Sequence, residues 1–199
     1  WARGGVVVDD TDWFENFDLP VEHERGLSRH DHHFYIGEAV LTLQPGVWSG
    51  IVASLHEAAD LDLDAAQRRF LNREIALLTQ AEAPAPELRG APDWVRQLVL
   101  AADSFLFARP LPDLPDGESV IAGYPWFLDW GRDSLIAARG LLAGGFVNEV
   151  RDLALVFARF EDRGTLPNTI HGSDATNRDT ADAPLWLGVV CEELATILG

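Results

Sequence analysis

The first 58 residues carry short apolar runs between turn-forming residues, a pattern that is typical of strands. The segments GGVVVDD (4–10), EAVLTLQPG (38–46) and SGIVASL (49–55) each predict a strand. Pro45-Gly46 is a turn signal, so we expect the last two segments to belong to an antiparallel hairpin. Leu41 and Leu43 share one face of an extended run, and we expect that face to be buried.

Downstream of this region the apolar residues recur at helical spacing. Leu63, Phe70 and Leu77 lie on one helical stripe, and Asp62 or Asp64 is placed to cap its start. A second helix is expected after Pro92-Asp93. The side that we expect it to bury contains Trp94, Leu98, Ala101, Ala102 and Phe105.

Three further helices are predicted, over residues 134–143, 146–159 and 182–197. A linker with three prolines (82–93) and a Pro-rich loop (109–119) separate the earlier elements. A polar segment, residues 164–180, connects the last two helices, and a loop of this length in a compact domain is usually functional or disordered.

The charge balance excludes some partners. The chain has 32 acidic and 15 basic residues, a formal net charge of −17. Such a surface repels phosphate, so we expect neither nucleic acid nor an anionic membrane as partner. A single cysteine allows no internal disulfide, which fits a cytoplasmic location.

Two polar clusters contain residue types that bind metals. The run RHDHHF places His30, His32 and His33 beside Asp31, but a solvated strand or loop is the more economical interpretation. The acidic run DDTDWFENFD (9–18) lacks the glycine and the final glutamate of a calcium loop, so we interpret it as acidic surface. No metal is expected.

Residues 122–135, AGYPWFLDWGRDSL, place charged groups among aromatic rings, where desolvation is costly. Either Arg132 forms a buried ion pair with an aspartate and fixes the turn, or a polar ligand satisfies these groups. Arginine and carboxylates can bind sugar hydroxyls, and tryptophan rings can stack on sugar faces. Asn168, Asp179, Asp182 and Trp186 could face the same cavity; alternatively, they belong to a surface loop with an ordinary cap.

Three blocks, VIAGYPWFLDWGRDSLIAARGLL (120–142), RGTLPN (163–168) and TADAPLW (180–186), resemble the amylo-α-1,6-glucosidase domain of bacterial-type glycogen debranching enzymes. Upstream, residues 23–46 resemble the end of the β-sandwich that precedes that domain. The resemblance implies a mainly α fold: a β-sandwich portion (1–58), a helical linker (59–91) and the first part of an (α/α)6 barrel (92–199).

The resemblance also implies roles for individual residues in binding a terminal glucose. Arg132 and Asp133 would hold its hydroxyls, and two tryptophans would form walls. The full set of expected substrate-binding residues is Trp126, Asp129, Trp130, Arg132, Asp133, Asn168, Asp182 and Trp186. Asp133 and Asp182 are catalytic candidates by chemistry but look like binders by family position. We expect the acid and base downstream of residue 199, so that residues 1–199 alone are inactive.

The implied reaction is hydrolysis of α-1,6 branch points in glycogen or related α-glucans with inversion. It needs two carboxylates and a water but no cofactor. Two other interpretations remain open at this point: another (α/α)6 hydrolase such as a glucoamylase or trehalase-like enzyme, and a non-catalytic glucan-binding module. The oligomeric state is also open.

Overall fold

The computed structural model describes residues 1–124, 127–172 and 174–199, and these fall into two compact units. Unit 1 comprises Trp1–Leu71 and unit 2 comprises Asn72–Gly199. Six α-helices and ten short strands are present among the described residues. About 42% of the structure is helical, which agrees with the mainly α prediction. The β-sandwich, the barrel and the three-part division of the chain stay predictions.

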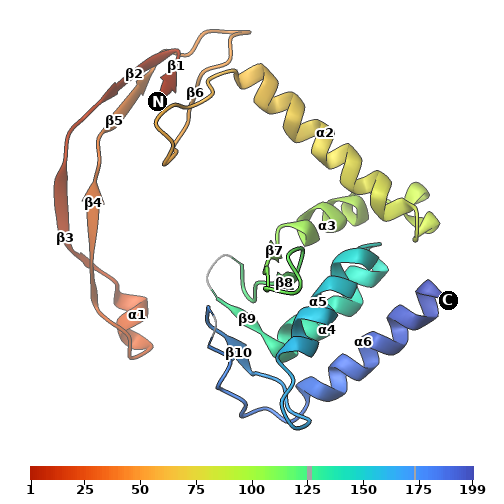
Figure 1. The fold of residues 1–199 in the computed structure, drawn as a ribbon. Helices are drawn as coiled ribbons and strands as arrows, with labels where there is room; N and C mark the ends of the chain where they lie inside the picture. Colours follow the sequence, from red (N-terminus) through yellow and green to blue (C-terminus); the bar gives the residue numbers. More distant parts are fainter. Residues whose placement is uncertain (125–126, 173) are drawn as a thin grey trace. The chain divides into compact units, whose positions relative to one another are not determined.

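Unit 1 is built from antiparallel pairs of strands (Figure 1). Strand β2 (Gly5–Val8) pairs with β5 (Glu38–Leu41), and β3 (Asp12–Asp18) pairs with β4 (His30–Tyr35). A short helix, α1 (Pro20–Glu24), connects β3 to β4. Two shorter strands, β1 (Ala2–Arg3) and β6 (Gly50–Ile51), pair with each other.

The predicted hairpin between residues 38–46 and 49–55 is wrong. The turn at Pro45-Gly46 exists, with the Val47 amide donating to the Gln44 carbonyl at 3.2 Å. The flanking strands, however, take their partners from the beginning of the chain. An apolar pattern identifies a strand but does not say which strand lies beside it. Leu41 is half-buried, whereas Leu43 is 80% exposed, so the expected buried face is formed only in part.

The β3–β4 ladder was not predicted as a pair. Its acidic residues are interleaved with aromatic ones, and cross-strand aromatic contacts such as Trp13 with Phe34, at 5.0 Å between ring centroids, accompany the pairing. The histidine cluster lies on β4 with its side chains exposed. Among the described residues, no group of three or more His, Cys, Asp or Glu side chains is arranged to hold a metal ion.

Helix α2 (Leu63–Glu82) begins where the sequence predicted. The Asp62 carboxylate accepts a hydrogen bond from the Ala65 amide at 2.9 Å, so Asp62 rather than Asp64 caps the helix. The boundary between the two units falls inside this helix. A 3₁₀ segment (Pro86–Gly90) then leads to α3 (Asp93–Asp103).

The buried side of α3 differs from the prediction. Trp94 and Leu98 are 66% and 59% exposed, whereas Val99 is 5% exposed and lies in the core. Of the predicted stripe, Ala102 does pack against the core. The apolar residues of α3 extend around most of the helix, so their spacing alone does not define which stripe meets the core.

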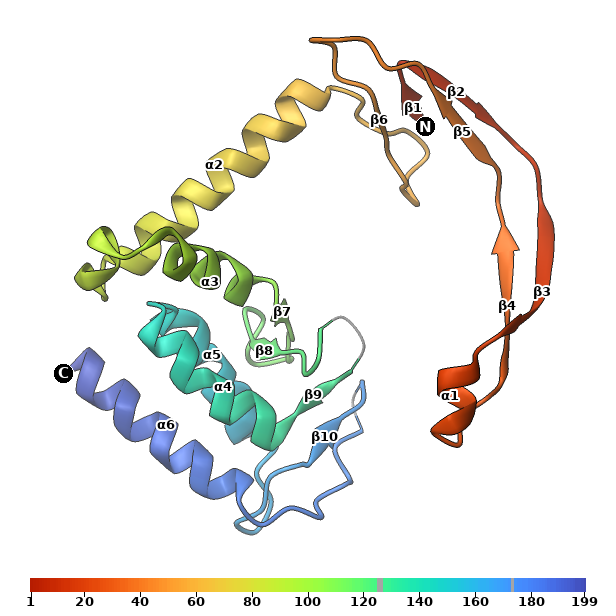
Figure 2. The same ribbon diagram turned by 180° about the vertical axis from the view of Figure 1, so that it is seen from behind.

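Unit 2 has its core where three helices meet: α4 (Gly131–Ala143), α5 (Val147–Arg159) and α6 (Ala183–Leu198) (Figures 1 and 2). Leu135, Phe157 and Val190, one from each helix, are fully buried. None of the helices in the described part of the chain is both long and apolar enough to cross a membrane.

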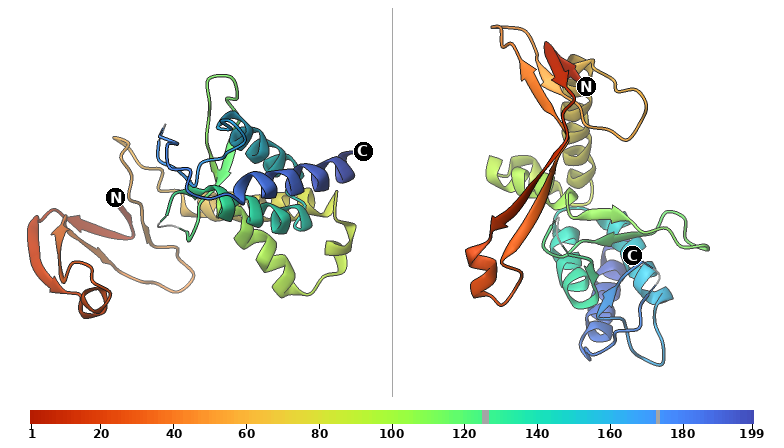
Figure 3. Two further views of the ribbon diagram at one scale, coloured as in Figure 1. Left: turned by 90° about the horizontal axis from the view of Figure 1, so that it is seen from below. Right: turned by 90° about the vertical axis from the view of Figure 1, so that its left-hand side faces the viewer.

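Two small antiparallel pairs complete unit 2. Strands β7 (Leu106–Ala108) and β8 (Glu118–Val120) form a hairpin whose loop extends beyond the strands (Figure 3). Strand β9 (Asp129–Trp130) pairs with β10 (Thr169–Ile170) and leads directly into α4. The β9–β10 pair therefore brings the polar segment 164–180 to the beginning of α4.

Candidate functional site

The WGRD turn, residues 130–133, is held tightly against the RGTLPN segment. The Gly131 amide donates to the Asn168 carbonyl at 2.9 Å, and the Asn168 amide donates to the Asn177 carbonyl at 2.7 Å. A Cβ at position 131 would clash with the Pro167 carbonyl oxygen. Only glycine therefore allows this approach, which brings two of the sequence blocks together.

Asp129 is not presented to a ligand in the way that we expected. It is fully buried, and its carboxylate accepts hydrogen bonds from Arg109 at 2.7 Å and from the Ser119 hydroxyl at 3.0 Å. A buried ion pair at this turn was one of the alternatives from the sequence, but its arginine is Arg109 and not Arg132. No signal in the sequence spacing identified Arg109, which lies 20 residues upstream in the Pro-rich loop.

Arg132 and Asp182 meet at the beginnings of two helices. The Nη1 atom of Arg132 lies 3.7 Å from an oxygen of Asp182, and the two side chains are 48% and 42% exposed. Asp182 occupies the N-cap position of α6, as expected for a helix start, but its side chain makes no capping hydrogen bond. The carboxylate is therefore free of the usual capping role and accessible to solvent beside a guanidinium group.

The other expected binding residues lie on the same elements. Asp133 is exposed in the first turn of α4, where the positive end of the helix dipole favours a carboxylate. Trp130 is half-buried opposite Thr169, and Asn168 is half-buried in the segment that meets the turn. Trp186, one turn into α6, is half-buried and packs against the core. Trp126 lies outside the described residues.

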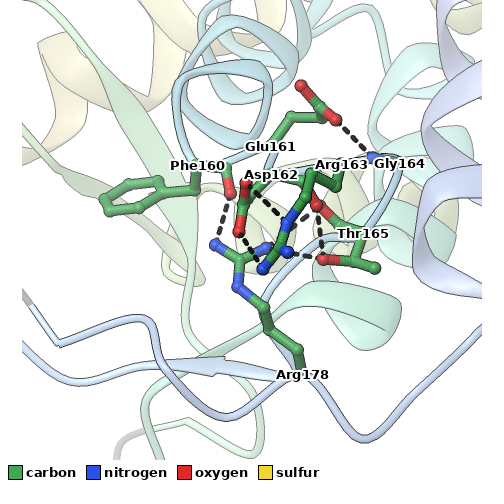
Figure 4. A network of polar contacts seen from close by, with 7 residues as sticks. All are labelled: Phe160, Glu161, Asp162, Arg163, Gly164, Thr165 and Arg178. Atoms are coloured by element: carbon green, nitrogen blue, oxygen red, sulfur yellow. Dashed lines mark hydrogen bonds and ion pairs between the residues drawn. The ribbon is translucent and has the colours of Figure 1, made fainter.

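A second arginine orders the polar segment (Figure 4). Arg178 donates from Nη2 to the Phe160 carbonyl at 2.7 Å, and from Nη1 to the carbonyl and hydroxyl oxygens of Thr165 at 3.0 and 3.1 Å. The Gly164 amide donates to the Glu161 carboxylate at 2.6 Å in the same network. Hydrogen bonds to backbone groups thus hold residues 160 and 165 against residue 178.

A known family matches the part of the chain that contains these residues. Residues 100–196 match the family model described as Amylo-alpha-1,6-glucosidase. The matched segment defines a domain of the glycosidase class. More particularly, the match contains all three of the sequence blocks, so the resemblance to the amylo-alpha-1,6-glucosidase domain inferred from them is confirmed. No curated protein and no solved structure gave a significant match to the chain.

Proposed function

We propose that the protein is a glycoside hydrolase that acts on α-1,6 branch points of glycogen or related α-glucans with inversion. The observation that carries the proposal is the meeting of Arg132 and Asp182, half exposed at two helix starts, inside the segment that matches the amylo-alpha-1,6-glucosidase family. In this proposal the pair binds the terminal glucose of a branch.

The chemistry of the pair suits a sugar. A guanidinium donates hydrogen bonds and a carboxylate accepts them, and a sugar hydroxyl can do both. At 3.7 Å and about half exposure the ion pair itself contributes little to stability, because solvent screens it. Glucose hydroxyls can therefore take the place of the ionic contact at low cost, and Trp130 supplies an aromatic face nearby in the chain.

Asp133, Asn168 and Trp186 are assigned to the same subsite. Inversion requires an acid and a base about 6.5–9.5 Å apart, with a water between the base and the sugar. We assign Asp133 and Asp182 to binding rather than to these two roles, in keeping with their position in the family pattern. The acid and base are then other carboxylates of the intact protein.

The test uses the intact protein with a branched limit dextrin, maltose and trehalose. Release of glucose from the limit dextrin, as the β-anomer when followed by proton NMR immediately after mixing, is the expected result. Preferential hydrolysis of maltose or trehalose would point instead to a glucoamylase or trehalase-like enzyme. Binding of dextrin without any turnover would identify a glucan-binding module and overturn the proposal.

A further inference from the structure

Arg109 joins three segments of unit 2 that converge on the WGRD turn. It follows β7 directly, and its side chain is only 15% exposed. Its Nη2 atom donates to Asp129 on β9 at 2.7 Å, and its Nη1 atom donates to the Gly172 carbonyl, after β10, at 3.1 Å. Its backbone amide donates to the Gly117 carbonyl at 2.6 Å and so closes the β7–β8 hairpin.

The Asp129 end of this contact is fixed from both sides. Arg109 occupies one carboxylate oxygen and the Ser119 hydroxyl occupies the other, and Asp129 is fully buried. The Arg109 Nε atom lies beside the second oxygen as an ion pair, without an aligned hydrogen bond to another described residue. A planar guanidinium against a carboxylate constrains direction as well as distance. Residue 129 therefore has one orientation, and Trp130 follows it directly.

We propose that Arg109 is a positioning residue for the glucose subsite: through Asp129 and Gly172 it sets the WGRD turn and the segment after β10 relative to each other. The inference rests on the proposed function of the site. The positioning role proposed for Arg109 differs from a purely stabilising role, because a buried ion pair can often be replaced by uncharged side chains with little loss of stability. Such a replacement would keep the fold but would not keep the geometry of the turn.

The test replaces both charges together, because removing one alone leaves the other buried without a partner. The variant is Arg109→Met combined with Asp129→Asn. The matched control is Arg159→Met combined with Asp113→Asn, which removes an ion pair with 2.6 Å between Nε and the carboxylate. That pair also joins the β7–β8 loop to another element, but its side chains are 47% and 60% exposed.

Two measurements are made on each protein: the affinity for maltose and for the branched dextrin, and the hydrogen-exchange protection of the Gly131 and Asn168 amides. In the Arg109 variant we expect affinity to fall about tenfold or more and both amides to lose protection, while α5 keeps its protection. The control should match the parent protein in both measurements.

Unchanged affinity and unchanged protection in the Arg109 variant would overturn the proposal. If that variant does not fold, the same two measurements on Arg109→Lys test the proposal, because lysine keeps the charge but lacks the planar guanidinium group. If the parent protein binds no glucan, the proposed function fails, and the amide protection alone then decides whether Arg109 positions the turn.

Discussion

At the scale of single residues, burial in unit 2 changes the ionisation of one carboxyl group, that of Glu118. Glu118 lies on β8 with one carboxylate oxygen buried and without a hydrogen-bond partner among the described residues. Burial raises the pKa of Glu118 above its ordinary value of 4.5, and the charges of Glu149, Asp152 and Asp103 raise that pKa further. The ionised form is therefore disfavoured in the folded state.

We expect Glu118→Gln to stabilise the protein at pH 7 and to have little effect at pH 4. The stability associated with protonated Glu118 is fully present below pH 4.5 and is lost as the pH rises through the higher folded-state pKa. An uncharged glutamine removes that loss. Thermal unfolding between pH 4 and 7 measures the effect of Glu118→Gln on the melting temperature, with Glu192→Gln at an exposed position as control. An equal change in melting temperature at both ends of this pH range would contradict the explanation.

Asp182 and Asp62 both precede helices, but only Asp62 makes a capping hydrogen bond. We expect Asp62→Ala to cost about 1 kcal/mol and Asp182→Ala clearly less, as measured by chemical unfolding.

Asp182→Asn should leave the melting temperature unchanged and weaken glucose binding. If Asp182→Asn abolishes turnover while affinity is unchanged, Asp182 is a catalytic residue and our assignment to binding is wrong.

The sequence identified part of this residue-scale arrangement and missed another part. Arg132 and Asp182 stand at predicted helix starts, so their positions could be inferred from helix signals and family blocks. Arg109 could not be inferred, because its partner is set by the tertiary approach of a hairpin to β9. A pairing between residues distant in sequence leaves no periodic signal along the chain.

At the scale of elements, α4 contains two glycines in different environments. At Gly131 a Cβ would clash with the Pro167 carbonyl oxygen, whereas at Gly140 a Cβ would meet no atom within 4 Å. We expect Gly140→Ala to stabilise the protein by about 0.4–1 kcal/mol, because alanine favours helix and restricts the unfolded chain. Gly131→Ala should destabilise it and weaken glucan binding. Equal effects of the two substitutions on the melting temperature would refute the close approach.

Helices were predicted better than strands in this chain. The helices α4, α5 and α6 lie within a few residues of their predicted bounds, and α2 begins beside its predicted cap, because long periodic segments carry their own signal. The strands of unit 1 pair with partners distant in sequence, which an alternating pattern does not specify. The misassigned face of α3 has the same origin, since packing decides between neighbouring apolar stripes.

At the scale of the whole molecule, the net charge of −17 dominates the electrostatics. Most ion pairs in the described residues have at least one substantially exposed partner and contribute little, while repulsion among the acidic groups opposes the compact state. We therefore expect the melting temperature to rise between 10 and 150 mM NaCl, by roughly 2–4 °C for each kcal/mol of repulsion screened. Sucrose serves as the uncharged control. A fall in the melting temperature with added salt would show that ion pairs outweigh repulsion.

The contacts of Arg178 have a consequence for how this protein can vary over evolutionary time. Its acceptors include the backbone carbonyls of Phe160 and Thr165, which every amino acid provides. The guanidinium, in contrast, has no substitute with the same reach and number of donors. As far as this network is concerned, we therefore expect position 160 to tolerate substitution, whereas we expect position 178 to remain arginine.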